Sequence, residues 1–531
     1  MLTGDPAARR LSHLIFRAFR GTLVSLDRQS VQQDCHDHFA GTSEWHRRNT
    51  AMQHNRNPVT PYETYRGLPS LAGLCTLEQA TRPGLLVEQC VERLKRYHYA
   101  FKRLHEIFTA RITAEPIYEL KTAFSLHAYL CAEHVTSLRQ RVGEMREPPL
   151  RLEVVPDDHL VIFFDEILAA PTTAELLVGL YERALPAVDA ALERHQAETN
   201  PLADAPTMRW TRFARLELAD LLSFGRQAVA QLVDAPSRAA MTPWLRLLED
   251  CLAAAGRIEG PAANAGPPTV RRYSAKPYVY DPVPQRDGRF LDPWNQAVNA
   301  EAFLYDPALP ARAKTLMMYF KRLREIDVPE MMASIIAQTH DKPWAYYHDM
   351  SRQLWDEARH ALMGEVGFVA NGVDWKLARV TWNWSFRLNT ECTPLERHAV
   401  LYFIEQGLMG KTGKRFEWEV GLQSGDALSA TFQDYDWADE VLHARIGREW
   451  YLPEIGDAAQ AVAYGDECWS RILSNWREVR DQGLTQHENW WPGLYRAACR
   501  SWGVPPDPKV LAYGTTYEDS RADLKNVTAL A

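Results

Sequence analysis

Apolar positions follow helical periodicity over two long regions of this chain. From about residue 85 to 255 they recur every three or four residues, as in "VEQCVERLKRYHYAFKRLHEIF". This spacing places them on one face of an amphipathic helix, and alternating strand patterns are nearly absent. We therefore expect an all-α protein whose first helical domain covers residues 85–255.

A stretch rich in Gly and Pro, residues 256–293, separates this domain from a second helical region. It carries no apolar period, which is typical of a linker. The expected organisation is listed in chain order: an irregular segment 1–84, a helical domain 85–255, a linker 256–293, a second helical domain 294–455, and a C-terminal helix and tail 456–531.

The second helical domain has the pattern of two helical hairpins. We predict helices at 311–338 and 343–366, joined by "THDK", and at 394–422 and 426–449, joined by "QSGD". A longer Trp-rich connection joins the two hairpins. Two hairpins linked by a longer crossover are typical of a four-helix bundle.

Two of these predicted helices carry nearly the same motif, "DEARH" at 356–360 and "DEVLH" at 439–443. Positions i and i+3 of a helix share one face, so Glu357 with His360, and Glu440 with His443, can each point at one ion. Carboxylate and imidazole ligands suit iron or manganese. The repeat predicts one metal centre built from both hairpins, and such a centre takes one further Glu from each remaining helix.

In the second hairpin that residue is Glu405, which stands in the apolar stretch "LYFIEQGLMG" at a depth similar to that of Glu440. In the first hairpin, Glu325 lies 16 residues before a turn near residue 341, and Glu357 lies 16 residues after it. This matched depth favours Glu325. Glu330 remains the alternative because apolar residues flank it and the neighbouring proline can shift the helix register.

The aspartates that open the two motifs have a different expected role. Asp356 and Asp439 point about 100° away from the adjacent glutamates on a helix. We expect each to accept the second N–H of a ligand histidine on another helix, which orients the imidazole and raises its basicity.

The net charge and the length of the apolar stretches limit the classes of partner that we expect for this protein. A formal net charge of −8 gives no basic footprint, so we expect no nucleic-acid partner. Apolar stretches such as "LVIFF" are far shorter than the roughly 18–20 residues of a membrane helix, and the N-terminus lacks a signal core. We therefore expect a cytoplasmic protein with no membrane partner.

The eight cysteines contain no C-x-x-C pair, which favours reduced thiols that serve in packing.

The first helical domain contains no Glu-x-x-His motif. We expect it to be a metal-free bundle that packs on the second domain and either supports a homodimer or covers a substrate entrance.

"DEARH" and "DEVLH" resemble the paired ligand helices of the ferritin-like di-iron carboxylate superfamily, which includes desaturases, N-oxygenases and ribonucleotide reductase small subunits. "REIDVP" resembles the desaturase helix in which a ligand Glu stands four residues before Pro, and this likeness selects Glu325. The resemblance implies a ferritin-like bundle at residues 294–455 and a degenerate one before it. It also implies two iron ions, or a manganese–iron pair, held by six ligands: Glu325, Glu357, His360, Glu405, Glu440 and His443.

The resemblance further implies an oxidase or oxygenase that activates O₂ to oxidise a small organic substrate. Flavin, nicotinamide and iron–sulfur motifs are not visible in the sequence, so we expect an external electron donor or reductase. Two other functions stay open, namely iron oxidation or handling, and a non-catalytic scaffold.

Overall fold

The computed structural model describes residues 62–146, 150–260, 270–381, 383–410, 413–473 and 476–519. All regular secondary structure in these ranges is helical, which confirms the expected all-α class. The chain forms two compact units, Met1–Thr81 and Arg82–Ala531. The described part of the first unit holds three short helices: η2 (Tyr65–Gly67), η3 (Leu71–Gly73) and α2 (Leu77–Ala80).

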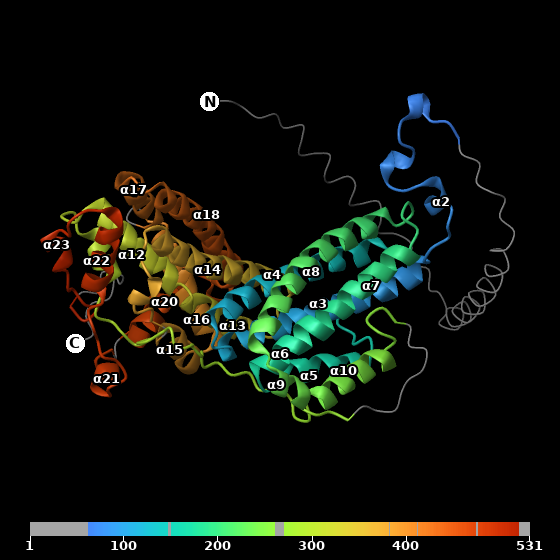
Figure 1. Cartoon of the computed structure of the whole chain (residues 1–531), viewed down its shortest axis with the longest axis horizontal. Coiled ribbons are helices and arrows are strands. Elements are labelled where there is room, and N and C mark those ends of the chain that lie inside the picture. The colour runs from blue at the N-terminus through green and yellow to red at the C-terminus, as the bar shows by residue number, and fades with distance from the viewer. Residues whose placement is uncertain are drawn as a thin grey trace. The chain divides into compact units, whose positions relative to one another are not determined.

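The second unit begins with helices that correspond to the region predicted from apolar periodicity (Figure 1). The helix α3 buries one continuous apolar stripe against α4, and both helices exceed seven turns. Their bounds, with those of the helices that follow, are α3 (Val87–Ala114), α4 (Tyr118–Glu144), α5 (Asp158–Leu168), α6 (Thr173–Val178), the π-helical η4 (Gly179–Ala184), α7 (Leu185–Glu198), α8 (Ala205–Leu232), α9 (Ala235–Ala240) and α10 (Thr242–Ala254).

The rest of this unit contains the predicted hairpins and additional helices. α12 and α13 pack against α14, α16 and α17 pack against α18, and α14 contacts α18. None of the described helices combines the length and apolar character needed to cross a bilayer. The bounds are α11 (Ala300–Tyr305), α12 (Ala311–Arg324), α13 (Asp327–Gln338), α14 (Trp344–Ala370), η5 (Trp375–Leu377), α15 (Asn383–Glu391), α16 (Pro394–Leu408), α17 (Lys414–Ser424), α18 (Ala427–Trp450), α19 (Leu452–Ile455), α20 (Ala458–Leu473), α21 (Trp476–Asp481), α22 (Trp491–Trp502) and α23 (Pro508–Leu511).

Two predicted helices are each divided in two. The helix expected at 311–338 breaks between α12 and α13, where Pro329 occupies the first turn of α13, a position that needs no backbone N–H donor. The helix expected at 394–422 breaks between α16 and α17. At Gly413, which precedes α17, a Cβ atom would collide with the carbonyl oxygen of Leu408. The close approach therefore requires glycine at this position.

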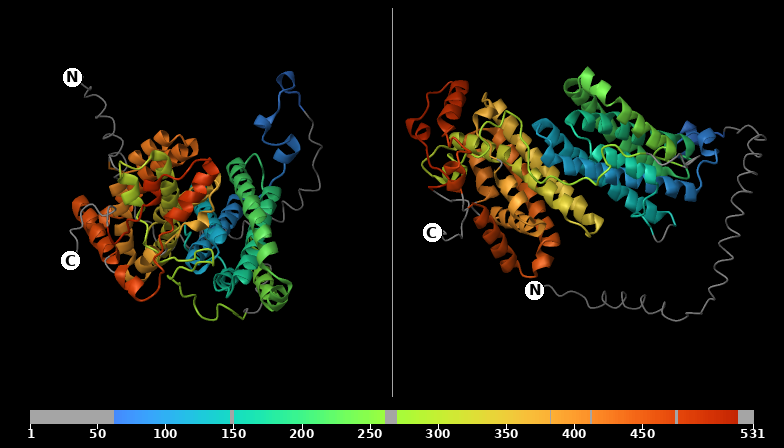
Figure 2. Two further views of the ribbon diagram at one scale, coloured as in Figure 1. Left: turned by 60° about the vertical axis from the view of Figure 1, so that its left-hand side comes forward. Right: turned by 90° about the horizontal axis from the view of Figure 1, so that it is seen from below.

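The two helical regions of this unit share one apolar core, and α13 and α14 lie beside α3 and α4 (Figures 1 and 2). Polar contacts also cross between them. His105 of α3 lies 2.7 Å, Nε2 to Oγ, from Ser351 of α14. The buried Lys121 of α4 lies 2.9 Å, Nζ to Oε1, from Glu330 of α13. The first helical region therefore supports the helices that carry the predicted metal ligands.

One of these crossing contacts makes stability depend on pH. His348 of α14 lies 2.8 Å, Nε2 to Oε1, from Glu133 of α4, and 3.3 Å, Nδ1 to Oδ1, from Asp349. Hydrogen bonds to Asp349 and Glu133 raise the pKa of His348 to about 9. This pKa exceeds the value of about 6.5 for histidine in the unfolded chain. The contact therefore contributes its full stabilisation below about pH 6.5. The stabilisation is lost as the pH rises through about 9.

We predict that His348→Gln lowers the free energy of unfolding by about 1–2 kcal/mol at pH 6, after allowance for the partly exposed side chain. The difference between variant and wild type should disappear near pH 9.5, as measured by urea unfolding across this range. His340→Gln, at an exposed position, is the control and should follow the wild-type curve. A His348→Gln difference that stays constant with pH would contradict the prediction.

Candidate metal centre

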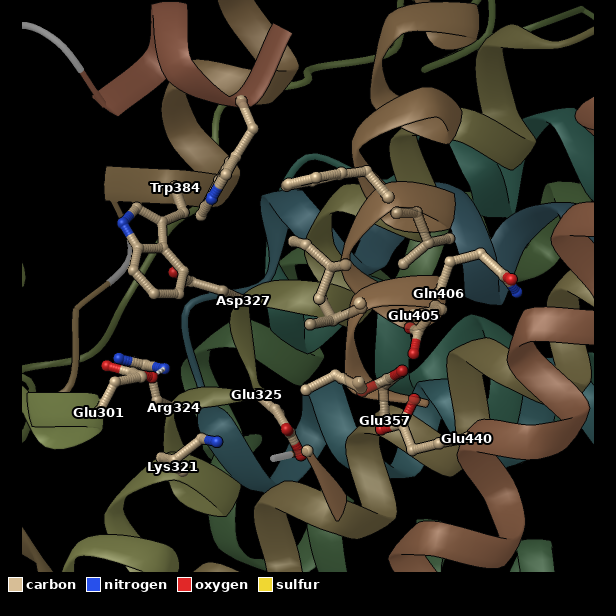
Figure 3. Close-up of a pocket in the computed structure, with 18 of the residues that line it drawn as sticks. Glu301, Lys321, Arg324, Glu325, Asp327, Glu357, Trp384, Glu405, Gln406 and Glu440 are labelled. Atoms are coloured by element: carbon tan, nitrogen blue, oxygen red, sulfur yellow. Dashed lines mark hydrogen bonds and ion pairs between the residues drawn. The ribbon is translucent and has the colours of Figure 1, made fainter. Parts of the chain in front are cut away.

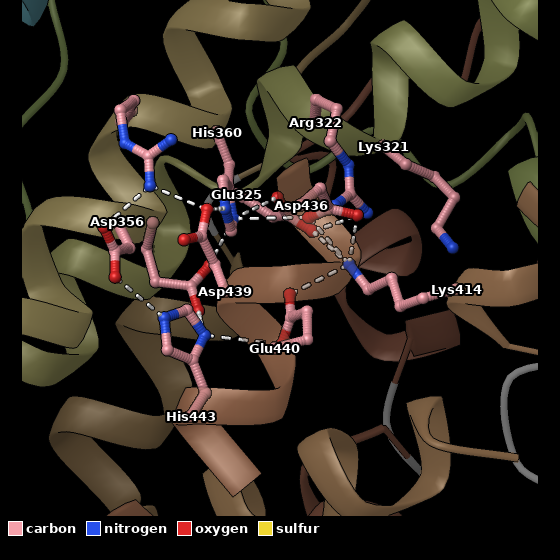
Figure 4. A network of polar contacts seen from close by, with 12 residues as sticks. Lys321, Arg322, Glu325, Asp356, His360, Lys414, Asp436, Asp439, Glu440 and His443 are labelled. Carbon is pink, nitrogen blue, oxygen red and sulfur yellow. Dashed lines mark hydrogen bonds and ion pairs between the residues drawn. The ribbon is translucent and has the colours of Figure 1, made fainter. Parts of the chain in front are cut away.

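The six predicted ligand residues come together between α12, α14, α16 and α18 (Figures 3 and 4). One ligand atom from each of Glu357, Glu405, Glu440 and His443 lies within 4.8 Å of the others. Atoms of Glu325, Glu357 and His360 satisfy the same limit. Glu357 belongs to both groups, so the two groups are adjacent. All six side chains are buried except that of Glu325, which is half-buried.

The two histidines direct one ring nitrogen each at the carboxylates. Nδ1 of His443 lies 3.2 Å from Glu357 Oε1 and 3.4 Å from Glu440 Oε2. Nδ1 of His360 lies 3.4 Å from Glu325 Oε2 and 3.6 Å from Glu357 Oε2. Among the described residues, neither Nδ1 atom has a hydrogen-bond partner, and one oxygen each of Glu325, Glu405 and Glu440 also lacks one. These buried donor atoms are therefore available to a ligand.

The other ring nitrogen of each histidine contacts an aspartate of the opposite helix. Nε2 of His360 on α14 lies 3.1 Å from Asp439 Oδ2 on α18. Nε2 of His443 on α18 lies 3.4 Å from Asp356 Oδ2 on α14. Arg359 joins the two aspartates, since its Nη2 donates to Asp356 Oδ1 at 2.8 Å and to Asp439 Oδ2 at 2.6 Å. Each imidazole is thereby held with Nδ1 toward the centre.

Charged residues that sequence reasoning missed complete one side of the site (Figure 4). Nζ of Lys414, the first residue of α17, lies 2.9 Å from Asp436 Oδ2 and 2.9 Å from Glu440 Oε1. Nη2 of Arg322 lies 2.9 Å from Glu325 Oε1, and its Nη1 donates to Asp436. Asp436 stands four residues before Glu440, so helical spacing could have indicated it. Lys414 follows a helix break, and no local pattern indicates it.

Electrostatics within the site depend on this arrangement. Burial, and next the negative charge of Glu440, raise the pKa of Glu405 well above its usual range. Burial opposes ionisation of Glu440 as well, but the charge of Lys414 and the contacts with Glu405 and His443 together outweigh it and hold the pKa of Glu440 well below its usual range. Burial lowers the pKa of His360, whereas the hydrogen bond to Asp439 and the nearby carboxylates of Glu325 and Glu357 raise it to about 10. Protons therefore compete with cations for these atoms.

The donor set fits two divalent ions. Four carboxylates and two imidazoles suit iron or manganese, and four negative charges balance two doubly charged cations. Glu357 is placed to bridge the two groups because its two oxygens lie nearest to different histidines. The chemistry of the donors and the unpartnered buried nitrogens thus agree with the predicted ligand set.

Glu330, the alternative to Glu325, lies in a separate ion-pair network. Its carboxylate receives Arg286 Nε and Nη2, each at 2.9 Å, as well as Lys121 Nζ at 2.9 Å and Ser385 Oγ at 2.8 Å. Both oxygens are therefore already bound by protein donors. The structure places Glu325, and not Glu330, beside His360.

A cavity of about 380 Å³ adjoins the glutamates (Figure 3). Glu325, Glu357, Glu405 and Glu440 line one part of it. Aliphatic and aromatic residues of α13, α15, α16 and α20 line much of the remainder: Val328, Met331, Trp384, Leu401, Ile404, Val462 and Trp469. The metal-ligand candidates therefore face a largely apolar space.

Comparison of the chain with protein-family models, with curated proteins and with solved structures gives no match. The geometry of the site itself is thus the basis for assigning a function.

The choice between Glu325 and Glu330 leads to a direct prediction. Glu325→Gln removes a charged donor beside His360 and should reduce bound iron from about two ions per chain to about one or fewer. Glu330→Gln should keep both ions, although breaking its buried ion pairs should lower the free energy of unfolding by about 3–5 kcal/mol. Metal analysis of the purified variants and urea unfolding measure these effects. Loss of metal in Glu330→Gln alone would reverse the assignment.

The aspartate contacts can be tested separately. Asp439→Asn removes the charged acceptor of the His360 N–H and should weaken metal binding about 10- to 100-fold without removing a ligand. Asp434→Asn, an exposed change on the same helix, should leave the affinity unchanged. Competition with a chelator of known affinity gives both values, and equal affinities in the two variants would show that Asp439 does not support the histidine.

Proposed function

We propose that this chain is an O₂-dependent di-metal oxidoreductase with a ferritin-like four-helix bundle. It holds two iron ions, or a manganese–iron pair, and oxidises a small organic molecule. The observation that carries this proposal is the position of the donor set, whose four glutamates line a largely apolar cavity.

The cavity favours oxidation of an organic substrate over iron handling or a scaffold role. A space of about 380 Å³ has the size of a pocket for a small ligand. Leu401, Ile404 and Val462 would remove apolar surface of a substrate from water. A protein that oxidises or handles iron needs no apolar cavity beside its metal centre. A non-catalytic scaffold protein needs no buried ligand atoms that lack hydrogen-bond partners.

Two reduced iron ions would supply the electrons that activate O₂, and an external donor would restore them. The chain's own residues keep this centre in place. Asp356 and Asp439 fix the orientation of the two imidazoles, and Gln353 Nε2 donates to Glu405 Oε1 at 3.2 Å. These contacts hold the donor atoms before the ions bind, which lowers the reorganisation needed for function.

Positive side chains limit the cost of gathering the carboxylates. Lys414 and Arg322 neutralise Asp436, and Arg322 also contacts Glu325. Glu440 is shared, because Oε1 faces Lys414 while Oε2 faces His443 Nδ1. The Glu440 carboxylate thus contacts both a positively charged side chain, Lys414, and a candidate metal ligand, His443.

The proposal predicts that the protein purified with iron binds about two ions per chain and consumes O₂ after anaerobic chemical reduction. Replacement of both Glu357 and His360 by Ala should abolish both properties. Metal analysis and an oxygen electrode provide the measurements. Two ions with no O₂ consumption would leave metal binding but exclude the oxidoreductase, and absence of metal would exclude the centre itself.

A cavity-filling variant separates the substrate role from the metal role. Val462→Phe on α20 places a larger side chain in the cavity from a helix that carries no ligand. Binding of apolar molecules such as indole should weaken at least tenfold in the iron-loaded protein, while iron content stays unchanged. Val366→Phe, at an exposed position of α14, should change neither property. Equal indole binding in both variants would remove the cavity as the substrate site.

A further inference from the structure

A second cluster of metal-ligand side chains lies among the first helices of the larger unit. Cys90 belongs to the first turn of α3, His195 to the last turn of α7, and Asp204 directly precedes α8. Their relative exposures are 2%, 0% and 9%. One donor atom from each lies within 4.8 Å of the other two. A thiol, an imidazole and a carboxylate thus converge in a place that the proposed oxidation centre does not use.

The separations of these donors lie within about 0.1 Å of the range for the edges of a tetrahedral zinc site. Cys90 Sγ lies 3.2 Å from Asp204 Oδ2 and 3.9 Å from His195 Nε2, and His195 Nε2 lies 3.6 Å from Asp204 Oδ2. Zinc bonds of about 2.0–2.3 Å at tetrahedral angles place the ligand atoms about 3.3–3.8 Å apart. An ion therefore fits between the three atoms with small side-chain adjustments.

Two of the three donors are also held by contacts outside the cluster, as metal ligands commonly are. The Nδ1 atom of His195 lies 3.4 Å from the hydroxyl of Tyr97, which leaves Nε2 toward the cluster. Asp204 Oδ1 accepts a hydrogen bond from Arg141 Nη2 at 2.8 Å, which leaves Oδ2 toward the cluster. The donor atoms therefore have the orientation that a shared cation requires.

We propose that Cys90, His195 and Asp204 bind a zinc ion, although the sequence led us to expect a metal-free domain here. Mixed sulfur, nitrogen and oxygen donors suit zinc. When the ion binds, the Cys90 thiol releases its proton to solvent, and its hydrogen bond to Asp204 is lost. Cys90 Sγ and Asp204 Oδ2 then each bind the ion. Water fills the remaining tetrahedral position.

Charge around the cluster balances in the zinc-bound state. Arg141 pairs with Asp204 and also with Glu144, at 3.2 Å from Nη1 to Oε2. The zinc ion and Arg141 carry three positive charges, and the Cys90 thiolate, Asp204 and Glu144 carry three negative charges. The ion would link the ends of three helices and join Cys90 to two ligands more than 100 residues away in the chain, which constrains the unfolded state as well.

Cobalt(II) provides a test that the oxidation centre cannot imitate, since none of the ligands of that centre is a cysteine. Addition of cobalt(II) to the intact, metal-depleted protein should produce a sulfur-to-cobalt charge-transfer band in the near ultraviolet. Zinc should displace this band at a stoichiometry of one per chain. Absence of the band in the wild-type protein would overturn the proposal, whatever happens at the oxidation centre.

Variants identify the ligands. Cys90→Ser should abolish the charge-transfer band, and His195→Gln should weaken cobalt binding at least tenfold. Cys131→Ser removes another buried thiol of the same helical region and should keep the wild-type band. A band that persists in Cys90→Ser, or is lost in Cys131→Ser, would overturn the assignment. The test in wild-type protein remains decisive if Cys90→Ser does not fold.

Discussion

Mutual repulsion among buried carboxylates is the constraint on which the rest of the helical bundle depends. Glu325, Glu357, Glu405 and Glu440 meet in an interior where water screens charge weakly. Without cations, burial and next the charge of Glu440 raise the pKa of Glu405, so that a proton on this carboxylate relieves the repulsion. A stable fold with this centre therefore needs positive charge, which the chain supplies from α12 and α17 and which bound metal ions would complete.

The residues that meet at the candidate metal centre could be predicted from sequence because helical geometry relates their positions to local spacing. Glu-x-x-His places two donors on one face, and equal distance from a hairpin turn places two helices at matching depth. The matched depth of Glu325 agrees with its place beside His360, although the predicted single helix breaks immediately after it. Because of that break, Glu325 directly follows the last residue of α12, and α12 packs against α14.

Other parts of the site could not be predicted, since they depend on tertiary paths. Lys414 reaches the centre only because the chain turns at Gly413 and begins a new helix. The cavity depends on packing of α20 against α16, and apolar periodicity does not specify that contact. The cluster of Cys90, His195 and Asp204 has no recognisable motif, because Cys90 lies more than 100 residues before the other two members. Long-range contacts of this kind require the folded structure.

The reciprocal contacts between α14 and α18 have a consequence for assembly. Asp356 serves the histidine of α18, and Asp439 serves the histidine of α14, with Arg359 joining the two aspartates. A slip of one helix by a single turn would break both imidazole contacts together and leave the Nε2 atoms of two buried histidines without their acceptors. The repeated motif thus disfavours misaligned packing, because only one register of α14 against α18 satisfies both copies.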